Sequence, residues 1–172
     1  MQTVQPDCKA KQRIHRGKND NMSIDQSYGS PRWTGEIADC SLPVTLDTYS
    51  NCAFGCVYCF SQYQRGIGST QEKYLQKQVS CVNVEKIKEL FAGKIENQEA
   101  GIGQFWRYIK DRRPIQYGGL SDQFDGFEKK YGKTYEVLKF LREINYPICF
   151  STKSAWVFSD PKYQELFRGA DN

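Results

Sequence analysis

The chain has 172 residues, a formal net charge of +4 and seven cysteines. This length suits one domain with a real core, and no apolar run approaches the roughly 20 residues that span a membrane. Residues 1–18 contain no apolar segment of the kind that directs secretion. Composition therefore argues against a membrane protein and against a secreted, disulfide-linked protein, and we expect a cytoplasmic one.

Residues 1–40 are polar, rich in Asn, Gln, Ser and Lys, and lack clear periodicity. This pattern predicts a polar, partly ordered N-terminal extension, followed by an ordered core over residues 41–172. Basic side chains gather in the extension and again at residues 110–113, just before a strand predicted at residues 115–117. Such patches can contact a nucleic-acid backbone, but a charged run is more often a solvated surface. The basic residues are Lys9, Lys11, Arg13, Arg16, Lys18, Lys110, Arg112 and Arg113.

The first half of the core begins with a predicted strand at residues 42–46, which leads into a polar turn at residues 47–51. A second strand-like run covers residues 78–82. A helix should follow, with Asn83 as its N-cap and Gly93 at its end. The apolar face of this helix consists of Val84, Ile87, Leu90 and Phe91.

In the second half, an amphipathic segment at residues 105–110 precedes a predicted strand at 115–117. Thr134 is expected to cap a strong helix that Pro147 closes off. The inner face of that helix consists of Val137, Leu138, Leu141 and Ile144.

A third predicted sheet strand covers residues 148–150. The last helix should begin with Asp160 as its cap and Pro161 in its first turn, and end at Gly169. Strands and helices thus alternate, which predicts an α/β fold with a parallel sheet and crossover helices. Polar segments follow three strands, and in such sheets functional groups collect beyond the carboxyl ends of the strands. These segments are residues 51–60, 118–122 and 151–154.

Cys52, Cys56 and Cys59 form a C-x3-C-x2-C motif directly after the first predicted strand. Neighbours this close would form strained disulfide loops, and thiolates are the soft ligands that iron–sulfur clusters and zinc prefer. Three cysteines suffice for three corners of a cubane cluster and leave the fourth iron open to a small molecule. Gly55 lets the backbone pass close to the sulfides. We predict a 4Fe–4S cluster on these three residues.

Zinc is the alternative, but a structural zinc site needs a fourth ligand, usually in two paired knuckles. The single histidine is His15, and the other cysteines are scattered singly. An all-cysteine zinc site recruiting Cys40 would suit a small zinc-stabilised module that uses the basic extension on nucleic acid. Cys81 and Cys149 lie in apolar runs and are interpreted as small buried hydrophobes, whereas nothing marks Cys8 or Cys40 as catalytic.

The cysteine motif resembles that of the radical S-adenosylmethionine superfamily, with Tyr58 in its aromatic position. The resemblance implies that the open iron chelates the amino and carboxylate groups of S-adenosylmethionine. Reductive cleavage then yields a 5'-deoxyadenosyl radical that abstracts hydrogen from a substrate. A protein reductant such as flavodoxin or ferredoxin is also implied.

Gly118, Gly119 and Leu120 resemble the superfamily's GGE-type motif, in which backbone carbonyls receive the methionine amino group. The acidic third residue is replaced by Leu120, so the contact would rest on the main chain or on Asp122.

The pair Ser121-Asp122 and the later Ser151-Thr152-Lys153 resemble the spore photoproduct lyase branch more narrowly. In that branch a serine and a lysine hold the methionine carboxylate, which implies this role for Ser121 and Lys153. The branch also has a cysteine hydrogen donor just ahead of the Ser-Asp pair, where this chain has Gly119 and Leu120. We therefore expect lyase-like cofactor chemistry on an unassigned substrate.

The resemblance covers about residues 43–168 and implies a partial (β/α) barrel. The superfamily core usually has six β/α units, and this chain supplies about the first three. We accordingly expect an N-terminal portion of the core, from a truncated or split reading frame or one completed by a second polypeptide. A half barrel would leave an open edge after the third sheet strand. A cluster-binding fragment without activity is the remaining alternative.

Overall fold

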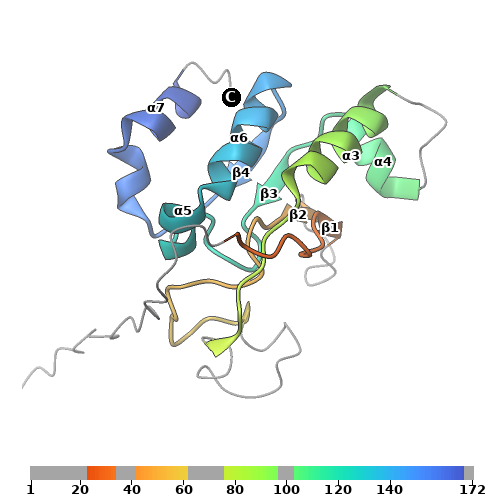
Figure 1. Ribbon diagram of the computed structural model, residues 1–172. Coiled ribbons are helices and arrows are strands. Elements are labelled where there is room, and N and C mark those ends of the chain that lie inside the picture. The colour runs from red at the N-terminus through yellow and green to blue at the C-terminus, as the bar shows by residue number, and fades with distance from the viewer. Residues whose placement is uncertain (1–22, 34–41, 62–75, 97–102, 169–172) are drawn as a thin grey trace, which may run out of the picture.

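The computed structural model describes residues 23–33, 42–61, 76–96 and 103–168 (Figure 1). These residues form a mixed α/β fold with a four-stranded sheet and five α-helices. The strands are β1 Arg32–Trp33, β2 Val44–Leu46, β3 Ile115–Tyr117 and β4 Ile148–Phe150. The helices are α3 Val84–Glu96, α4 Gly103–Lys110, α5 Gly126–Tyr131, α6 Lys133–Glu143 and α7 Pro161–Phe167, with a short 3-10 helix, η1, at Ala155–Phe158.

The sheet has the order β1-β2-β3-β4, and β2, β3 and β4 are parallel. The predicted parallel arrangement of the three core strands is therefore confirmed. Strand β1 was not predicted: it comes from the N-terminal extension and pairs antiparallel with β2, with Arg32 opposite Thr45. Within the described ranges the sheet is open and no barrel is closed.

The strand predicted at residues 78–82 is wrong. Ser80 and Cys81 form only isolated bridges, to Asp25 and Tyr49. The backbone N–H of Cys81 donates to the Asp25 carbonyl at 2.7 Å, and that of Tyr28 donates to the Cys81 carbonyl at 3.1 Å. The donors and acceptors of this run are thus used by the extension and the turn after β2, not by a full strand partner.

The core lies between the sheet and the helices, where α3 and α6 pack side by side (Figure 1). Phe91 of α3 is fully buried and meets Phe140 of α6 and Tyr146 edge to face, with ring centroids 6.2 and 5.1 Å apart. Both geometries are favourable for aromatic pairs. All three residues of β2 are buried, as expected of an inner strand of a sheet covered by other elements.

Two predicted helix caps are confirmed. The Asn83 side chain accepts a hydrogen bond from the Lys86 N–H at 3.0 Å, and Asp160 accepts one from the Lys162 N–H at 2.9 Å. The predicted end of the first helix at Gly93 is wrong, because α3 continues to Glu96. A solvent-exposed glycine costs a helix only about 1 kcal/mol, which does not end a helix that packing stabilises.

The predicted cap at Thr134 is also wrong. Helix α6 begins at Lys133, and Gly132 precedes it in the left-handed conformation with φ 66°. The Thr134 and Tyr135 N–H groups donate instead to the carboxylate of Glu128, at 2.7 and 2.8 Å. Glu128 lies on α5, a helix that was not predicted, and a carboxylate at a helix N-terminus is favourable.

The same carboxylate connects two further elements. Glu128 is buried and also accepts hydrogen bonds from the Tyr49 hydroxyl, at 2.6 Å, and from the Tyr163 hydroxyl of α7. Burial and then the nearby Glu128 charge raise the pKa of Tyr49 well above its ordinary range, so its hydroxyl remains a donor. Glu128 therefore joins α5, α6, α7 and the segment after β2 in one fully satisfied network.

Strand β4 ends the described sheet, and this position changes the interpretation of one cysteine. Cys149 is exposed, so the prediction that it is buried is wrong; Cys81 is fully buried, as predicted. A cavity of about 310 Å³ lies beside β4, between α6 and α7, with Ile148, Phe150 and Phe167 among its lining residues. Among the helices of the described ranges, none has the length and apolar character to cross a membrane.

Candidate functional site

The three polar segments predicted to share one end of the sheet do meet there. The Ala53 N–H of the cysteine loop donates to Asp125 Oδ2 at 2.5 Å, just beyond the segment after β3. The Thr152 hydroxyl after β4 donates to Asp122 Oδ1 at 2.7 Å. Lys153 Nζ lies 3.2 Å from Cys56 Sγ, so the third segment also contacts the first.

The cysteine loop, residues 52–59, turns tightly. Gly55 has φ 58°, in the left-handed region, and the Cys59 N–H donates to the Cys56 carbonyl at 3.0 Å. The Asn51 side chain accepts a hydrogen bond from the Cys52 N–H at 2.8 Å. Cys52, Cys56 and Cys59 are all free, partly exposed thiols.

Cys52 lies at the inner side of this loop. Burial, and then the negative charge of Asp125, raise the pKa of its thiol to about 12. Backbone hydrogen bonds from Asp122 and Phe54 oppose that rise. Cys52 therefore lies against the segment that follows β3. Its raised pKa keeps the thiol protonated in the cluster-free chain, and only the amide hydrogen bonds to its sulfur act in favour of the thiolate.

Lys153 is exposed and faces the opposite side of the cysteine loop. Its Nζ lies 4.5 Å from the centroid of the Tyr58 ring as well as close to Cys56 Sγ. Hydrogen bonds to Tyr58 and Cys56 raise the pKa of Lys153 above its ordinary value. The Lys153 backbone N–H donates to Asp122 Oδ2 at 2.7 Å, so this end of the lysine is held by the loop after β3.

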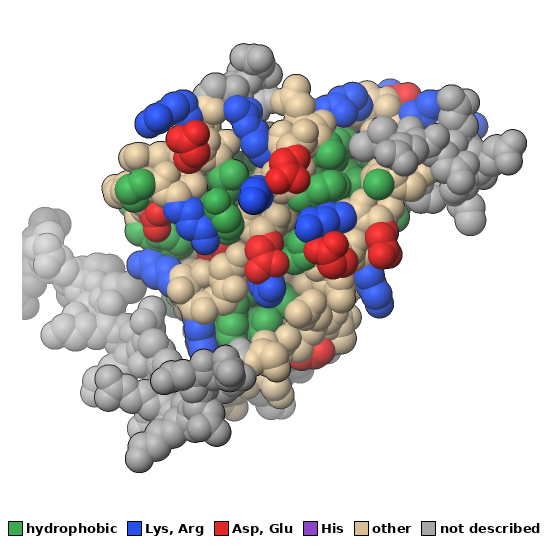
Figure 2. Space-filling model, turned by 45° about the horizontal axis from the view of Figure 1, so that its top comes forward, with side chains coloured by type: hydrophobic (Ala, Val, Ile, Leu, Met, Phe, Trp, Pro, Cys, Tyr) green, Lys and Arg blue, Asp and Glu red, His purple; other side chains and the backbone are tan. Residues whose placement is uncertain are grey.

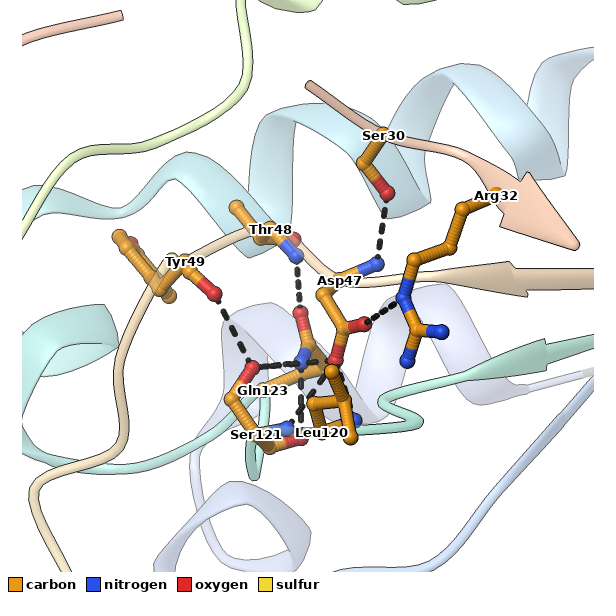
Figure 3. A network of polar contacts seen from close by, with 8 residues as sticks. All are labelled: Ser30, Arg32, Asp47, Thr48, Tyr49, Leu120, Ser121 and Gln123. Carbon is orange, nitrogen blue, oxygen red and sulfur yellow. Dashed lines mark hydrogen bonds and ion pairs between the residues drawn. The ribbon is translucent and has the colours of Figure 1, made fainter. Parts of the chain in front are cut away.

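Asp47, at the end of β2, organises the segment after β3 (Figure 3). Its Oδ1 accepts hydrogen bonds from the N–H groups of Leu120 and Ser121, at 2.8 and 3.0 Å. Arg32 of β1 has its Nε 3.9 Å from Asp47 Oδ2, and the Ser30 hydroxyl accepts the Asp47 N–H at 3.0 Å. Asp47 is fully buried, so an acidic charge that the sequence analysis did not single out is paired inside the fold.

Ser121 belongs to the same network. Its hydroxyl is buried, lies 3.2 Å from both Asp47 Oδ1 and the Tyr49 carbonyl, and accepts a hydrogen bond from Gln123 Nε2 at 2.9 Å. Gln123 in turn accepts the Thr48 N–H at 2.5 Å. The Ser121 hydroxyl thus connects the two loops, whereas Ser151 is exposed to solvent.

Gly118 and Gly119 have steric reasons for being glycine. Gly118 has φ 92°, and a Cβ there would lie 2.9 Å from the Ser121 carbonyl oxygen. A Cβ on Gly119 would lie 2.7 Å from Thr45 Cγ2 of β2. Both positions therefore require the chain to pass where a side chain does not fit.

Asp125 is the third acid that joins these loops. Besides the Ala53 contact, its Oδ1 accepts the Phe127 N–H at 2.8 Å and caps α5. Burial raises the pKa of Asp125 to about 6, and the hydrogen bonds from Ala53 and Phe127 oppose the rise. An Asp before a helical turn is a recognisable N-cap signal, but its contact with the cysteine loop depends on the tertiary fold.

The tip of the cysteine loop is apolar and exposed. Val57 is 82% exposed and Tyr58 73%, and Phe60 is exposed as well. Side chains of this kind, together on one loop, are typical of a surface that a ligand or partner covers.

No group of three or more His, Cys, Asp or Glu side chains in the described part of the chain lies close enough to hold one metal ion. A structural zinc site requires such convergence, with sulfurs at about 2.3 Å from one ion. A cubane cluster does not, because each cysteine binds a different iron. Cys40, which the zinc alternative would recruit, lies outside the described residues, as do Cys8 and His15.

The basic residues were assigned above to a charged surface. Arg112 donates to the Ile144 carbonyl at 2.9 Å, and its guanidinium lies 5.8 Å from the Tyr146 ring centroid. Arg113 lies 5.9 Å from the Tyr108 ring centroid. On the face drawn in Figure 2, basic and acidic side chains alternate and do not form a patch of one sign. The basic cluster of residues 9–18 lies outside the described ranges.

Comparisons of the chain with protein-family models, with curated proteins and with solved structures find no match. Any function is therefore inferred from the residues of the site.

Proposed function

We propose that this chain is the cluster-binding portion of a radical S-adenosylmethionine enzyme of the spore photoproduct lyase-like type. The observation that carries the proposal is the approach of Lys153 Nζ to within 3.2 Å of Cys56 Sγ. It brings a cation from the end of β4 to the cysteine loop at the end of β2. A ligand bound beside the cluster would meet both.

The donor set fits a 4Fe–4S cluster. Cys52, Cys56 and Cys59 are free thiols on one short loop with a left-handed glycine, and the backbone donates to the Cys52 sulfur. When bound, the cluster would supply the electron that cleaves S-adenosylmethionine to methionine and a 5'-deoxyadenosyl radical. All five described cysteines are free, which supports a reducing, cytoplasmic setting.

The role proposed for Lys153 is to hold the methionine carboxylate. An ammonium forms charge-assisted hydrogen bonds with a carboxylate, and the exposed Lys153 side chain is free of any carboxylate contact within the described residues. Asp122 fixes the Lys153 backbone and leaves its Nζ facing the cysteine loop. Ser121, the other predicted carboxylate contact, would act mainly by holding the segment after β3 in place.

The parallel strands β2, β3 and β4 would represent three β/α units of a partial barrel. Two features support completion by a second polypeptide: β4 is an end strand of the described sheet, and an apolar cavity lies beside it. An exposed strand edge with apolar side chains next to it is a liability unless covered.

S-adenosylmethionine binding to the anaerobically reconstituted chain tests the role of Lys153. Lys153→Met should weaken binding about tenfold or more, because one charge-assisted hydrogen bond contributes about 1.5–3 kcal/mol. Lys88→Met, which removes a partly exposed lysine paired with Glu85 on α3, is the matched control and should bind as the wild type does. Equal affinity in Lys153→Met would remove that residue from the site.

Formation of 5'-deoxyadenosine after reduction with dithionite tests the activity itself. We expect this product from the wild-type chain with cluster and S-adenosylmethionine, and none without the cluster. A reconstituted chain that binds the cofactor and forms no 5'-deoxyadenosine would be a cluster-binding fragment without activity.

A further inference from the structure

Asp47 holds the backbone of the glycine turn after β3 through one carboxylate oxygen. It is fully buried, and a single oxygen, Oδ1, receives two successive backbone N–H groups, those of Leu120 and Ser121 (Figure 3). The Asp47 backbone is held by Ser30, which accepts its N–H, and the Arg32 guanidinium lies beside Oδ2 of the carboxylate. Asp47 is thus held from the β1 side.

Backbone geometry determines where the neighbouring carbonyls point. In a planar trans peptide the C=O of one residue points opposite to the N–H of the next. The only cis peptide in the described residues is Ser30-Pro31. With the N–H groups of Leu120 and Ser121 directed at Asp47, the carbonyl oxygens of Gly119 and Leu120 therefore both point away from it.

These two oxygens are available to a ligand. In the described part of the chain neither accepts a hydrogen bond, whereas the next carbonyl, that of Ser121, accepts one from Gln123 Nε2 at 2.9 Å. Two neighbouring carbonyl oxygens that both point away from Asp47 can each accept a hydrogen bond from an amino group, which has more than one proton. Gly118 and Gly119 allow the turn to adopt this conformation, because a Cβ at either position would meet Ser121 or Thr45.

We propose that Asp47 is a positioning residue, which orients the Gly119 and Leu120 carbonyls toward the amino group of S-adenosylmethionine. This inference rests on the proposed function and adds the residue that gives the glycine turn its acceptor geometry. Asp47 acts through the backbone and makes no contact with the ligand.

The test compares S-adenosylmethionine with its analogue that carries hydrogen in place of the amino group. Affinities for the reconstituted 172-residue chain are measured by calorimetry under anaerobic conditions. The wild type should prefer S-adenosylmethionine by about tenfold, as expected for one or two hydrogen bonds. In Asp47→Ala the two ligands should bind within about twofold of each other, because the carbonyls lose their orientation.

Two variants serve as controls. Asp47→Asn keeps an oxygen that can accept both N–H groups and should retain the preference. Ser30→Ala removes a contact to the Asp47 backbone and leaves the carboxylate in place, so it should also retain it. If Asp47→Ala does not fold, Asp47→Thr, which offers one hydroxyl oxygen, takes its place, with the preference reduced to about threefold.

Full preference for S-adenosylmethionine in Asp47→Ala would overturn the inference. An equal loss of affinity for both ligands in that variant would overturn it as well, because it indicates a merely structural role. A wild-type chain that binds the analogue and S-adenosylmethionine equally would overturn it as well, while leaving the cluster intact. A wild-type chain that binds neither cluster nor ligand would instead refute the proposed function on which the inference rests.

Discussion

The two sides of the cysteine loop differ in how the fold treats them. On the inner side, the carboxylates of Asp47, Asp122 and Asp125 hold backbone N–H groups of neighbouring loops at 2.5 to 3.0 Å. We call these three residues the acidic cluster. On the outer side, Val57, Tyr58 and Phe60, the loop tip, have exposed apolar side chains.

This difference indicates that hydrogen bonds within the chain hold the acidic cluster in place, whereas the side chains of the loop tip are not held by packing. Each acid of this cluster accepts hydrogen bonds from the protein's own backbone, so these contacts form without a ligand. Of the loop tip, Tyr58 is approached by Lys153, while the apolar surface remains open to whatever binds there. Removing contacts of these buried acids or of their supporting residues should therefore destabilise the fold, whereas changing the tip should leave its stability intact.

The largest effect is expected at Glu128, which supports the acidic cluster through its hydrogen bond with Tyr49. Glu128→Ala leaves two backbone N–H groups and two tyrosine hydroxyls without their acceptor. We expect a loss of about 4 kcal/mol in the free energy of unfolding, or failure to fold, measured by urea denaturation.

Glu136→Ala is the matched control, since Glu136 makes only an exposed ion pair with Lys133. It should change the free energy of unfolding by less than about 0.5 kcal/mol. Similar losses of stability in Glu128→Ala and Glu136→Ala would contradict the distinction between the buried hydrogen-bond network and the exposed surface.

A smaller effect is expected from a methyl group at the glycine turn. Gly119→Ala places a Cβ 2.7 Å from Thr45 Cγ2, a contact that strands β2 and β3 must move to relieve. We expect destabilisation of about 2 kcal/mol in thermal denaturation. Gly93→Ala, on an open face of α3, should instead stabilise by about 1 kcal/mol. A neutral result at Gly119 would show that the turn after β3 is not tightly held.

Alkylation of the cluster-free chain should distinguish the cysteines by about tenfold in rate. Cys149 on the sheet edge and Cys56 in the loop should react faster than Cys81, which is fully buried. Burial raises the pKa of Cys81 to about 11, so its rate should stay low at pH 8 and rise only toward pH 11. Peptide mapping after iodoacetamide treatment measures each rate, and fast labelling of Cys81 in folded protein would contradict the described core.

The smallest effect is expected at the loop tip. Val57→Ser removes an apolar side chain that is 82% exposed, so the free energy of unfolding of the cluster-free chain should change by less than about 0.5 kcal/mol. A loss above about 1 kcal/mol in urea denaturation would mean that the tip is packed in solution. The tip would then not differ from the acidic cluster in its contribution to stability.

Local sequence signals predicted several elements well. The strands at 115–117 and 148–150 are short apolar runs bounded by Gly or Pro, and the structure has them at the same bounds. The caps at Asn83 and Asp160 rely on side chains that reach only two or three residues along the chain. The convergence of the loops followed from the rule for parallel strands.

The remaining features depend on contacts distant in sequence. Glu128 caps α6 from another helix and receives Tyr49, 79 residues away, so no local pattern marks it. Asp47 looked like an ordinary turn residue because its donors lie 73 and 74 residues further on. The exposure of Cys149 follows from the place of β4 in the sheet order, which an apolar run does not reveal.

The most direct test of the central claim is the metal content of the chain after anaerobic purification and reconstitution. We predict about four irons and four acid-labile sulfides per chain, with a broad visible charge-transfer band. Replacing Cys52, Cys56 and Cys59 by serine should abolish the band and the iron, and replacing Cys81 and Cys149 should change neither. One zinc per chain without sulfide would contradict the account and favour the zinc-stabilised module.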